Sequence, residues 1–234
     1  KGRGDMKSIP AVGLLAGNLL VTIGLYYVIS SDMGSALVYV CIFACMAFAA
    51  GVALRWFALG IFGAGAGFYL LWELDKIPPY MKERFQVLVD HSLYPLEAGW
   101  QQTRSLLAIG GGRLTGQGLL HGAQTQSTSS VNLPFRHTDF IFCVCGEELG
   151  MIGCLVVIAL LAAIIIRVLL VARRAETPFH CYVCVGVAAM LIFQTVVNIG
   201  MCLFVMPVIG LTLPFFSYGG SSLLTLYAAM GVVS

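Results

Sequence analysis

Charge is what this sequence has least of. Asp, Glu, Lys and Arg together make up 10% of its 234 residues, whereas a soluble domain carries about 25%. So few charged side chains cannot cover a globular surface, which excludes a soluble enzyme and a disordered chain. The formal net charge is only +2, so the strong positive charge typical of a nucleic-acid-binding protein is also missing.

Hydrophobic residues make up 59% of the chain and gather in long runs. A helix needs about 20 apolar residues to cross the hydrocarbon core of a bilayer. Runs of about that length lie at 10-30, 34-54, 56-74, 149-171, 180-206 and 214-234. We therefore predict an all-α integral membrane protein, a polytopic helical bundle with six spans. Its predicted parts are three transmembrane helices at 1-74, a large extracellular loop at 75-147 and three transmembrane helices at 148-234.

The distribution of Lys and Arg predicts how the spans are oriented. Short connections on one side carry all the basic residues outside the large loop, namely Lys1, Arg3, Lys7, Arg55, Arg167, Arg173 and Arg174. Short loops rich in Lys and Arg stay in the cytoplasm. The connection at 75-147 and the turn at 207-220 are therefore expected outside.

The outer loop is too long for a passive connection. Its segments 79-90 and 96-109 each combine an apolar and a polar face, which predicts helices lying at the membrane surface. Six glycines between 110 and 122 predict a backbone that turns tightly or approaches a ligand closely. A polar tract follows at 124-130.

A cluster of Pro, Arg, His and Asp occupies 134-139, next to an apolar stretch. In one interpretation Asp139 caps a helix, and Glu147 and Glu148 favour the first turn of the next helix through its dipole. In the other, Asp139 is a base beside cations that hold an anionic substrate.

A second unusual cluster lies at 207-222, where two prolines and three glycines interrupt an apolar stretch. Broken backbone persists at membrane depth only when it is buried in protein or lines a cavity. Hydroxyls follow at Ser217, Tyr218, Ser221 and Ser222. They are interpreted either as packing contacts between helices or as part of a cavity wall.

The eight cysteines include a C-x-x-C pair, Cys181 and Cys184, beside His180. A structural zinc site needs four ligands, and no second pair has matching spacing. We interpret these cysteines as small apolar residues of a helix.

The segments HTDFIF at 137-142, GEELG at 146-150 and LPFFSYGGSS at 213-222 together resemble the SEDS family of shape, elongation, division and sporulation proteins, which includes RodA, FtsW and SpoVE. Further similarity lies at 31-38, 82-85, 108-118 and 120-126, the last most similar to RodA-type members. The resemblance extends over essentially the whole chain. Family members have about ten spans, so the six here are expected to be a C-terminal fragment with the last six.

This resemblance implies a peptidoglycan glycosyltransferase of the bacterial cell (inner) membrane that polymerises lipid II, the undecaprenyl-pyrophosphoryl disaccharide-pentapeptide, during elongation or division. It implies an active site on the extracytoplasmic face, Asp139 as the catalytic base and a class B penicillin-binding protein as partner. The expected substrate-binding residues are Lys82, Arg84, Arg104, Gln117, His121, Arg136, His137, Thr138, Ser217 and Ser221. No metal ligand is predicted, although a divalent cation, Mg²⁺ or Mn²⁺, is a candidate cofactor. Val131 and Phe135 stand where several relatives carry acidic residues.

A flippase for the same lipid-linked precursor is the competing hypothesis. Its polar pathway would be formed by Asn18, Asp32, Gln194 and Asn198. Against it, ionisable residues mark transport pathways in membrane proteins, and here the spans contain almost none. A third hypothesis, a scaffold for division proteins, leaves the outer Asp and Arg residues unexplained.

Overall fold

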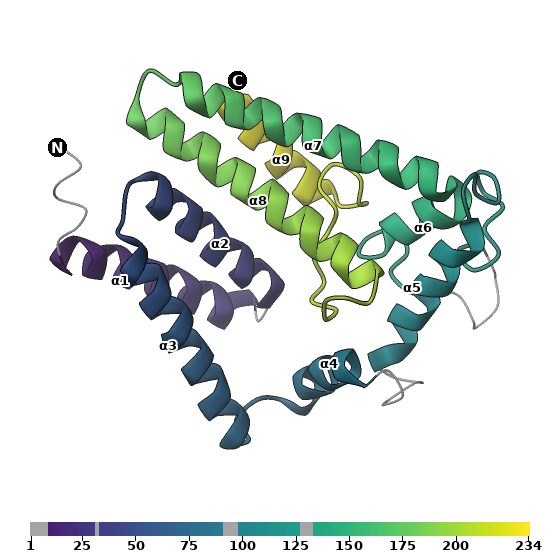
Figure 1. The fold of residues 1–234 in the computed structure, drawn as a ribbon, viewed down its shortest axis with the longest axis horizontal. Helices are drawn as coiled ribbons and strands as arrows, with labels where there is room; N and C mark the ends of the chain where they lie inside the picture. Colours follow the sequence, from purple (N-terminus) through teal and green to yellow (C-terminus); the bar gives the residue numbers. More distant parts are fainter. Residues whose placement is uncertain (1–8, 31–32, 91–97, 127–132) are drawn as a thin grey trace. The chain divides into compact units, whose positions relative to one another are not determined.

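Helices are the only regular secondary structure in the part of the chain that the structure describes. The computed structural model covers residues 9–30, 33–90, 98–126 and 133–234 (Figure 1). Its helices are α1 (Ile9–Ser30), α2 (Met33–Ala49), α3 (Leu54–Glu73), α4 (Pro79–Val89), α5 (Ala98–Gly112), α6 (Ile141–Glu148), α7 (Gly150–Arg174), α8 (Pro178–Cys202) and α9 (Gly220–Val233). The predicted all-α fold class is confirmed.

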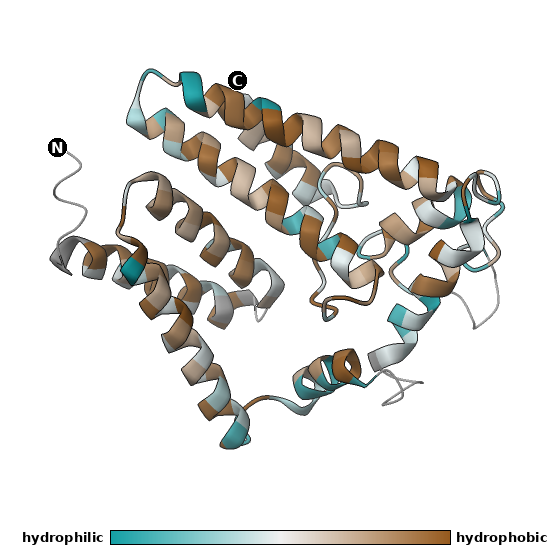
Figure 2. Cartoon of the chain, viewed as in Figure 1, coloured by the Kyte–Doolittle hydropathy of each residue, from teal (hydrophilic) through white to brown (hydrophobic). Residues whose placement is uncertain are grey.

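Three of these helices, α3, α7 and α8, are long and apolar enough to cross a membrane, and α2, α9 and the stretch 12–26 of α1 are shorter apolar helices. Hydrophobic residues run along most of α3, α7 and α8 (Figure 2). None of the residues of α3 is buried, and Phe62 is 78% exposed. Exposed apolar surface on this scale indicates contact with lipid.

Two predicted spans extend too far. The run 180-206 ends as a helix at Cys202, and the run 214-234 becomes helical only at Gly220. The residues between are mostly apolar, so hydropathy does not detect the break. The break arises because Phe204 takes a left-handed φ of 59° and because Pro207 and Pro214 have no N–H to continue a helix.

The glycine-rich stretch divides into two parts. Gly110, Gly111 and Gly112 belong to helix α5, so the prediction of a turning backbone is wrong for these three. It holds for Gly116 and Gly118, whose φ angles are 79° and 101°. Such angles are accessible to glycine at little cost.

The chain divides into two compact units. The first comprises 1–78, 168–190 and 233–234. Within it, α1 contacts α2, and the rings of Tyr26 and Tyr39 lie 5.3 Å apart. The first half of α8 packs closely against α2, because a Cβ placed on Gly186 would lie 3.0 Å from the Met46 sulfur.

The ends of α7 and α8 in this unit follow the usual helix signals. Arg173 and Arg174 occupy the last turn of α7, where positive charge favours the helix dipole. Pro178 begins α8, and the Thr177 hydroxyl accepts the N–H of His180 at 3.3 Å. Proline at the first helical position and a capping threonine both favour a helix start.

The second unit comprises 79–167 and 191–232 and contains both residue clusters singled out in the sequence. Helix α5 contacts α4 and packs extensively against α6. The backbones of α5 and α6 meet at Gly112, where any Cβ would overlap the Gly146 carbonyl oxygen. Glycine at position 112 therefore sets the spacing of these two helices.

Several expectations lie outside the described residues. These are the basic residues at 1–7, Asp32 and the start of the 31-38 motif, the start of the helix expected at 96-109, most of the polar tract at 124-130, and position 131. Helices are observed at both predicted positions, as α4 and α5, and Leu106 and Leu107 on the predicted apolar face of α5 are 40% and 52% exposed.

Gly112→Ala should destabilise the second unit, because its methyl group forces α5 and α6 apart. Overpacking of this kind costs about 1–3 kcal/mol of unfolding free energy. Gly110→Ala is the matched control, because no heavy atom lies within 4 Å of its added Cβ, and alanine favours a helix by about 0.5–1 kcal/mol. Thermal unfolding in detergent, followed by tryptophan fluorescence, measures both variants. Equal unfolding temperatures would contradict the close approach of the two backbones.

Candidate active site

Asp139 lies in the turn that precedes α6, and α8 holds its backbone. The carbonyl oxygen of Asp139 accepts a hydrogen bond from Nδ2 of Asn198 at 2.8 Å. The same Nδ2 donates to the carbonyl oxygen of Leu211 at 2.6 Å. Asn198 is fully buried, so it joins the Asp139 turn to the broken segment between α8 and α9.

A second connection is made by Ser217. Its hydroxyl donates to the carbonyl oxygen of Thr138 at 2.6 Å and accepts the N–H of Leu213 at 2.7 Å. The N–H of Tyr218 donates to the carbonyl oxygen of His137 at 2.8 Å. The two clusters found in the sequence, 134–139 and 207–222, therefore form one site.

The carboxylate of Asp139 faces this broken segment. A Cβ built on Gly210 would lie 3.7 Å from Oδ2 of Asp139, and Gly210 has a φ of 72°. A side chain at position 210 would be strained by that φ and would crowd the carboxylate. Asp139 itself is partly exposed.

The capping interpretation of Asp139 is wrong. The N-cap position of α6 is Phe140, and no side chain caps this helix. The companion interpretation of Glu147 and Glu148 is also wrong, because they end α6 and do not begin α7. Negative charge is unfavourable at a helix C-terminus, so other interactions must stabilise these two carboxylates.

Those interactions come from the glycine-rich loop at 116–126, which we call the clamped loop. Glu147 accepts the N–H groups of Gln124 at 2.7 Å and Thr125 at 2.8 Å. Glu148 accepts the N–H of Leu120 at 2.9 Å and the side-chain amide of Gln126 at 2.6 Å.

Both carboxylates are buried, with 0% and 4% exposed surface for Glu147 and Glu148. A buried carboxylate is expensive unless its oxygens accept hydrogen bonds. The acidic pair of the GEELG motif therefore fixes the clamped loop to the end of α6. The loop backbone is held as well, since the N–H of Gln117 donates to the Glu147 carbonyl oxygen at 2.9 Å.

The clamped loop carries two of the expected substrate-binding residues, Gln117 and His121. Both are exposed. Oε1 of Gln117 accepts the N–H of Ala123 at 2.9 Å, and Nδ1 of His121 lies 2.8 Å from the Leu119 carbonyl oxygen. Nε2 of Gln117 and Nε2 of His121 make no hydrogen bond within the described residues. Neither side chain is bonded to Asp139.

Of the expected cations on α4, Arg84 contacts the site. Its Nη1 donates to the carbonyl oxygen of Val208 at 2.5 Å, two residues before Gly210. Its guanidinium also lies 5.8 Å from the centre of the Tyr80 ring. Lys82 is half-buried on the same helix.

The other two arginines lie on different elements. Arg136 donates from Nε to Nε2 of His137 at 3.2 Å, directly beside the Asp139 turn. Arg104, on α5, donates to the Gln124 side chain at 3.3 Å and lies 5.7 Å from the centre of the Trp100 ring, so it contacts the clamped loop.

The expected hydroxyl residues differ in accessibility. Ser217 is 2% exposed, and its hydrogen bonds make it a positioning residue. Ser221 is exposed at the start of α9, where its carbonyl oxygen accepts the Thr225 hydroxyl at 2.8 Å. Thr138 is partly exposed, and its hydroxyl donates to the Phe135 carbonyl oxygen at 3.3 Å.

The sequence did not single out the buried polar face of α5. Gln102 is 2% exposed and donates to the Met206 carbonyl oxygen at 2.7 Å. Ser105 is fully buried; its hydroxyl donates to the Cys202 carbonyl oxygen at 2.5 Å and lies 2.7 Å from the Cys143 sulfur. The sequence does contain a signal for this face: Gln102 and Ser105 are three positions apart, so they lie on the same side of a helix.

The cysteine pair Cys181 and Cys184 lies on α8. Within the described ranges, no three His, Cys, Asp or Glu side chains are arranged to hold a metal ion. Of the residues proposed for a flippase pathway, Asn198 holds the Asp139 turn, and Asn18 is exposed on α1.

Glu147→Gln should release the clamped loop, because the amide replaces one accepting oxygen by a donor that faces a backbone N–H. Leaving a buried N–H without an acceptor costs about 1–3 kcal/mol. Hydrogen exchange at Gln124 and Thr125 should therefore accelerate by about 10-fold or more. The control is Glu176→Gln, at an exposed position between α7 and α8. Unchanged exchange in Glu147→Gln would disprove the clamp.

The chain is similar to several known proteins. A family model described as cell cycle protein, FTSW_RODA_SPOVE, matches residues 6–234. Peptidoglycan glycosyltransferase MrdB of Escherichia coli K12 is 38% identical over 202 residues, which are 86% of this chain and 54% of that protein. Probable peptidoglycan glycosyltransferase FtsW of Coxiella burnetii is 37% identical over 234 residues, 99% of this chain and 59% of the relative. The chain thus spans between half and two thirds of the length of these curated relatives.

Solved structures with the same fold are also found. A structure concerning the coordination of polymerization and crosslinking by a peptidoglycan synthase complex matches with a TM-score of 0.77 and 32% identity, over 96% of this chain and 61% of the other. The rod shape determining protein RodA of Thermus thermophilus matches with a TM-score of 0.60 and 30% identity, over 94% and 54% of the two chains. A family model over almost the whole chain and relatives above 30% identity confirm the resemblance, and the chain belongs to the SEDS family of FtsW, RodA and SpoVE proteins.

Proposed function

We propose that this protein polymerises lipid II into glycan strands, with Asp139 as the general base. The observation that carries the proposal is the way Asn198 and Ser217 hold the Asp139 turn against the 207–218 segment, with the carboxylate facing Gly210. The names of the relatives, peptidoglycan glycosyltransferases, support the reaction class.

In the proposed reaction the C4 hydroxyl of one sugar attacks C1 of the other lipid-linked sugar. A glycosidic bond forms as the bond from C1 to the pyrophosphate oxygen breaks, and the bonding electrons leave with the pyrophosphate. A hydroxyl is a weak nucleophile until a base removes its proton as the new bond forms. Asp139 would accept that proton, and its fixed backbone would keep the carboxylate aimed at the hydroxyl.

The departing prenyl pyrophosphate gains negative charge, so it requires positive charge nearby. Arg136 and Arg84 are the best-supported candidates, because one lies beside His137 and the other binds the Val208 carbonyl oxygen. Lys82 and Arg104 remain further candidates. A divalent cation is proposed only as an additional group that would neutralise the pyrophosphate.

We further propose that the site faces the extracytoplasmic side of the bacterial inner membrane and works beside a class B penicillin-binding protein. The basic end of α7, with Arg173 and Arg174, supports this orientation through the positive-inside rule. The partner is supported by the structural match to a complex that coordinates polymerization and crosslinking.

Asp139→Asn should lose nearly all polymerisation, because the amide keeps the shape of the side chain but cannot accept the proton. Positioned base catalysis contributes about 10²–10⁴-fold, so the rate should fall by at least about 10²-fold. Asp139→Glu should also be slow, since displacing a reacting group by about 1 Å can cost about 10²-fold. Gel-resolved glycan from labelled lipid II measures both rates.

The control for this experiment is folding and partner binding, measured by gel filtration and co-purification. Both should be unchanged in Asp139→Asn, because Asn198 holds the main-chain carbonyl at 139 and not the side chain. Wild-type polymerisation by Asp139→Asn would refute the base. Flipping of labelled lipid II across vesicles without polymerisation would favour the transporter instead.

The orientation is testable by labelling with an impermeant thiol reagent on intact cells. Cysteine at Leu119, which is 65% exposed on the clamped loop, should react. Cysteine at Glu176, which is exposed between α7 and α8, should react only after the membrane is permeabilised. The parent protein with its eight free cysteines gives the background. The reverse pattern would move the proposed site to the cytoplasmic face.

A further inference from the structure

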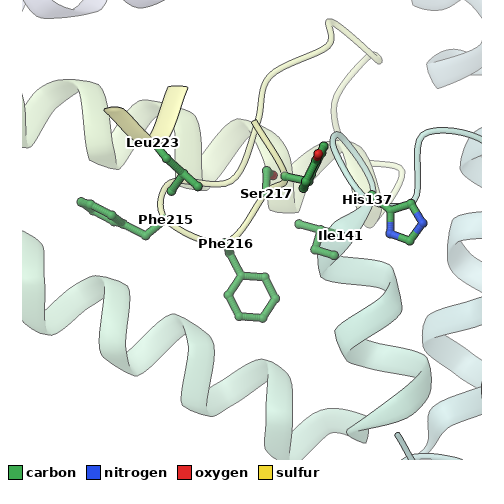
Figure 3. A pocket seen from close by; sticks show the side chains of 7 residues that line it. His137, Ile141, Phe215, Phe216, Ser217 and Leu223 are labelled. Carbon is green, nitrogen blue, oxygen red and sulfur yellow. The ribbon is translucent and has the colours of Figure 1, made fainter. Parts of the chain in front are cut away.

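A cavity of about 480 Å³ lies beside the Asp139 turn. One wall is formed by His137 and Ile141, on either side of Asp139, and the other by residues 215–218 and Leu223 (Figure 3). Its volume falls in the range typical of small-molecule sites, about 300–1,000 Å³. Asp139 is not among its lining residues, but His137 and Ile141 place the cavity beside the turn that carries Asp139.

The cavity offers few free polar groups. Ile141, Phe215, Phe216 and Leu223 supply apolar surface, and three lining residues are polar. Of these, Ser217 already donates to Thr138 and accepts from Leu213. Nε2 of His137 accepts from Arg136, which leaves Nδ1 of His137 and the phenol of Tyr218 for a ligand.

A cavity with so few available polar groups does not suit a sugar. A sugar ring carries a hydroxyl on most of its carbons, and each hydroxyl buried without a partner costs about 1–3 kcal/mol. Two available polar side chains cannot pair with them. A branched hydrocarbon chain has no such requirement and gains about 0.8 kcal/mol for each buried CH₂ group.

A positive charge lies next to one of the lining residues of the cavity. His137 accepts a hydrogen bond from the Arg136 guanidinium at 3.2 Å, so a cation lies beside the lining imidazole. A largely apolar pocket with a guanidinium bonded to one of its lining residues matches a ligand that joins a hydrocarbon chain to an anionic head. Guanidinium groups bind phosphate oxygens well because their N–H donors match the geometry of phosphate.

We propose that this cavity binds the first isoprene units of a prenyl diphosphate, with the diphosphate directed towards Arg136. The biological role of this site rests on the proposed function, because lipid II is such a prenyl diphosphate with a sugar attached. A chain held here would bring the scissile bond to the same turn as Asp139, which lies two residues from both His137 and Ile141.

The backbone conformation of Phe215 indicates that this wall of the cavity has a fixed shape. Phe215 has a φ of 61°, which is costly for a bulky side chain and is found where surrounding structure enforces it. Its ring makes an edge contact with Tyr227 on α9, with ring centres 5.7 Å apart. The strained backbone and the aromatic contact keep the Phe215 side chain in the cavity wall.

The test uses farnesyl diphosphate with a photoreactive group on its terminal isoprene, added to the protein in lipid nanodiscs. Cross-linked peptides are located by mass spectrometry. In the wild type they should contain residues 137–141 or 215–223. Excess unlabelled farnesyl diphosphate should compete, whereas inorganic pyrophosphate and added phosphatidylglycerol should not.

Leu223→Trp fills the cavity and should reduce labelling about 10-fold or more, as expected if two methylene contacts at about 0.8 kcal/mol each are lost. Leu224→Trp is the matched control, because Leu224 is the next residue of α9 but is 73% exposed and outside the lining. Gel filtration confirms that both variants fold. Phe216→Ala, which removes part of the wall, should also reduce labelling.

Labelling outside these segments, equal labelling of the two tryptophan variants, or competition by phosphatidylglycerol would each overturn the proposal. Asp139→Asn should label as the wild type does, since binding the chain does not require the base. If Asp139→Asn polymerises normally but labelling still maps to the cavity, the base is wrong and the prenyl site stands. If Asp139→Asn is inactive but labelling maps elsewhere, the prenyl site is wrong and the base stands.

Discussion

The structure of the second unit depends on supplying hydrogen-bond partners to a backbone segment that is not helical. Residues 203–219 connect α8 and α9 without forming a helix, and backbone polar groups near lipid cannot rely on water. Among the described residues, five side chains bond to the backbone of this segment: Arg84, Gln102, Asn198, Met201 and Ser217. They come from α4, α5, α8 and the segment itself, so four parts of the chain must be in place together.

The same bonds organise the proposed chemistry. Asn198 and Ser217 each bind both the 207–218 segment and the turn that carries Asp139. A polar group that satisfies the backbone therefore also fixes the base. Glu147 and Glu148 apply the same principle at the other end of α6, where buried carboxylates accept N–H groups and hold the clamped loop. Helix α6 is thus anchored at both ends by hydrogen bonds to non-helical backbone.

Local patterns in the sequence predicted the helices and both residue clusters, because apolar runs, prolines and glycines act within a few residues of their own position. They did not predict the partners of Glu147, Glu148 or Asn198, since these bonds join segments that are far apart in the chain. Gly112 shows the same limit: a glycine run suggests a turn, but here it permits helix contact with Gly146. The prolines and glycines at 207-222 predicted the broken backbone, but the apolar runs around them did not show that α8 ends at Cys202 or that α9 begins only at Gly220.

The separation of these contacts along the chain has a consequence for biosynthesis. The bonds from Glu147 and Glu148 to the clamped loop span 22 to 28 residues, so this part can assemble while the ribosome is still making α7. The bond from Arg84 to Val208 spans 124 residues, and it must wait until α8 has been inserted. The bonds from Asn198 and Ser217 to the Asp139 turn span 59 and 79 residues. Since chains are synthesised at about 5–20 residues per second, this turn remains without these two anchors for several seconds after it leaves the ribosome.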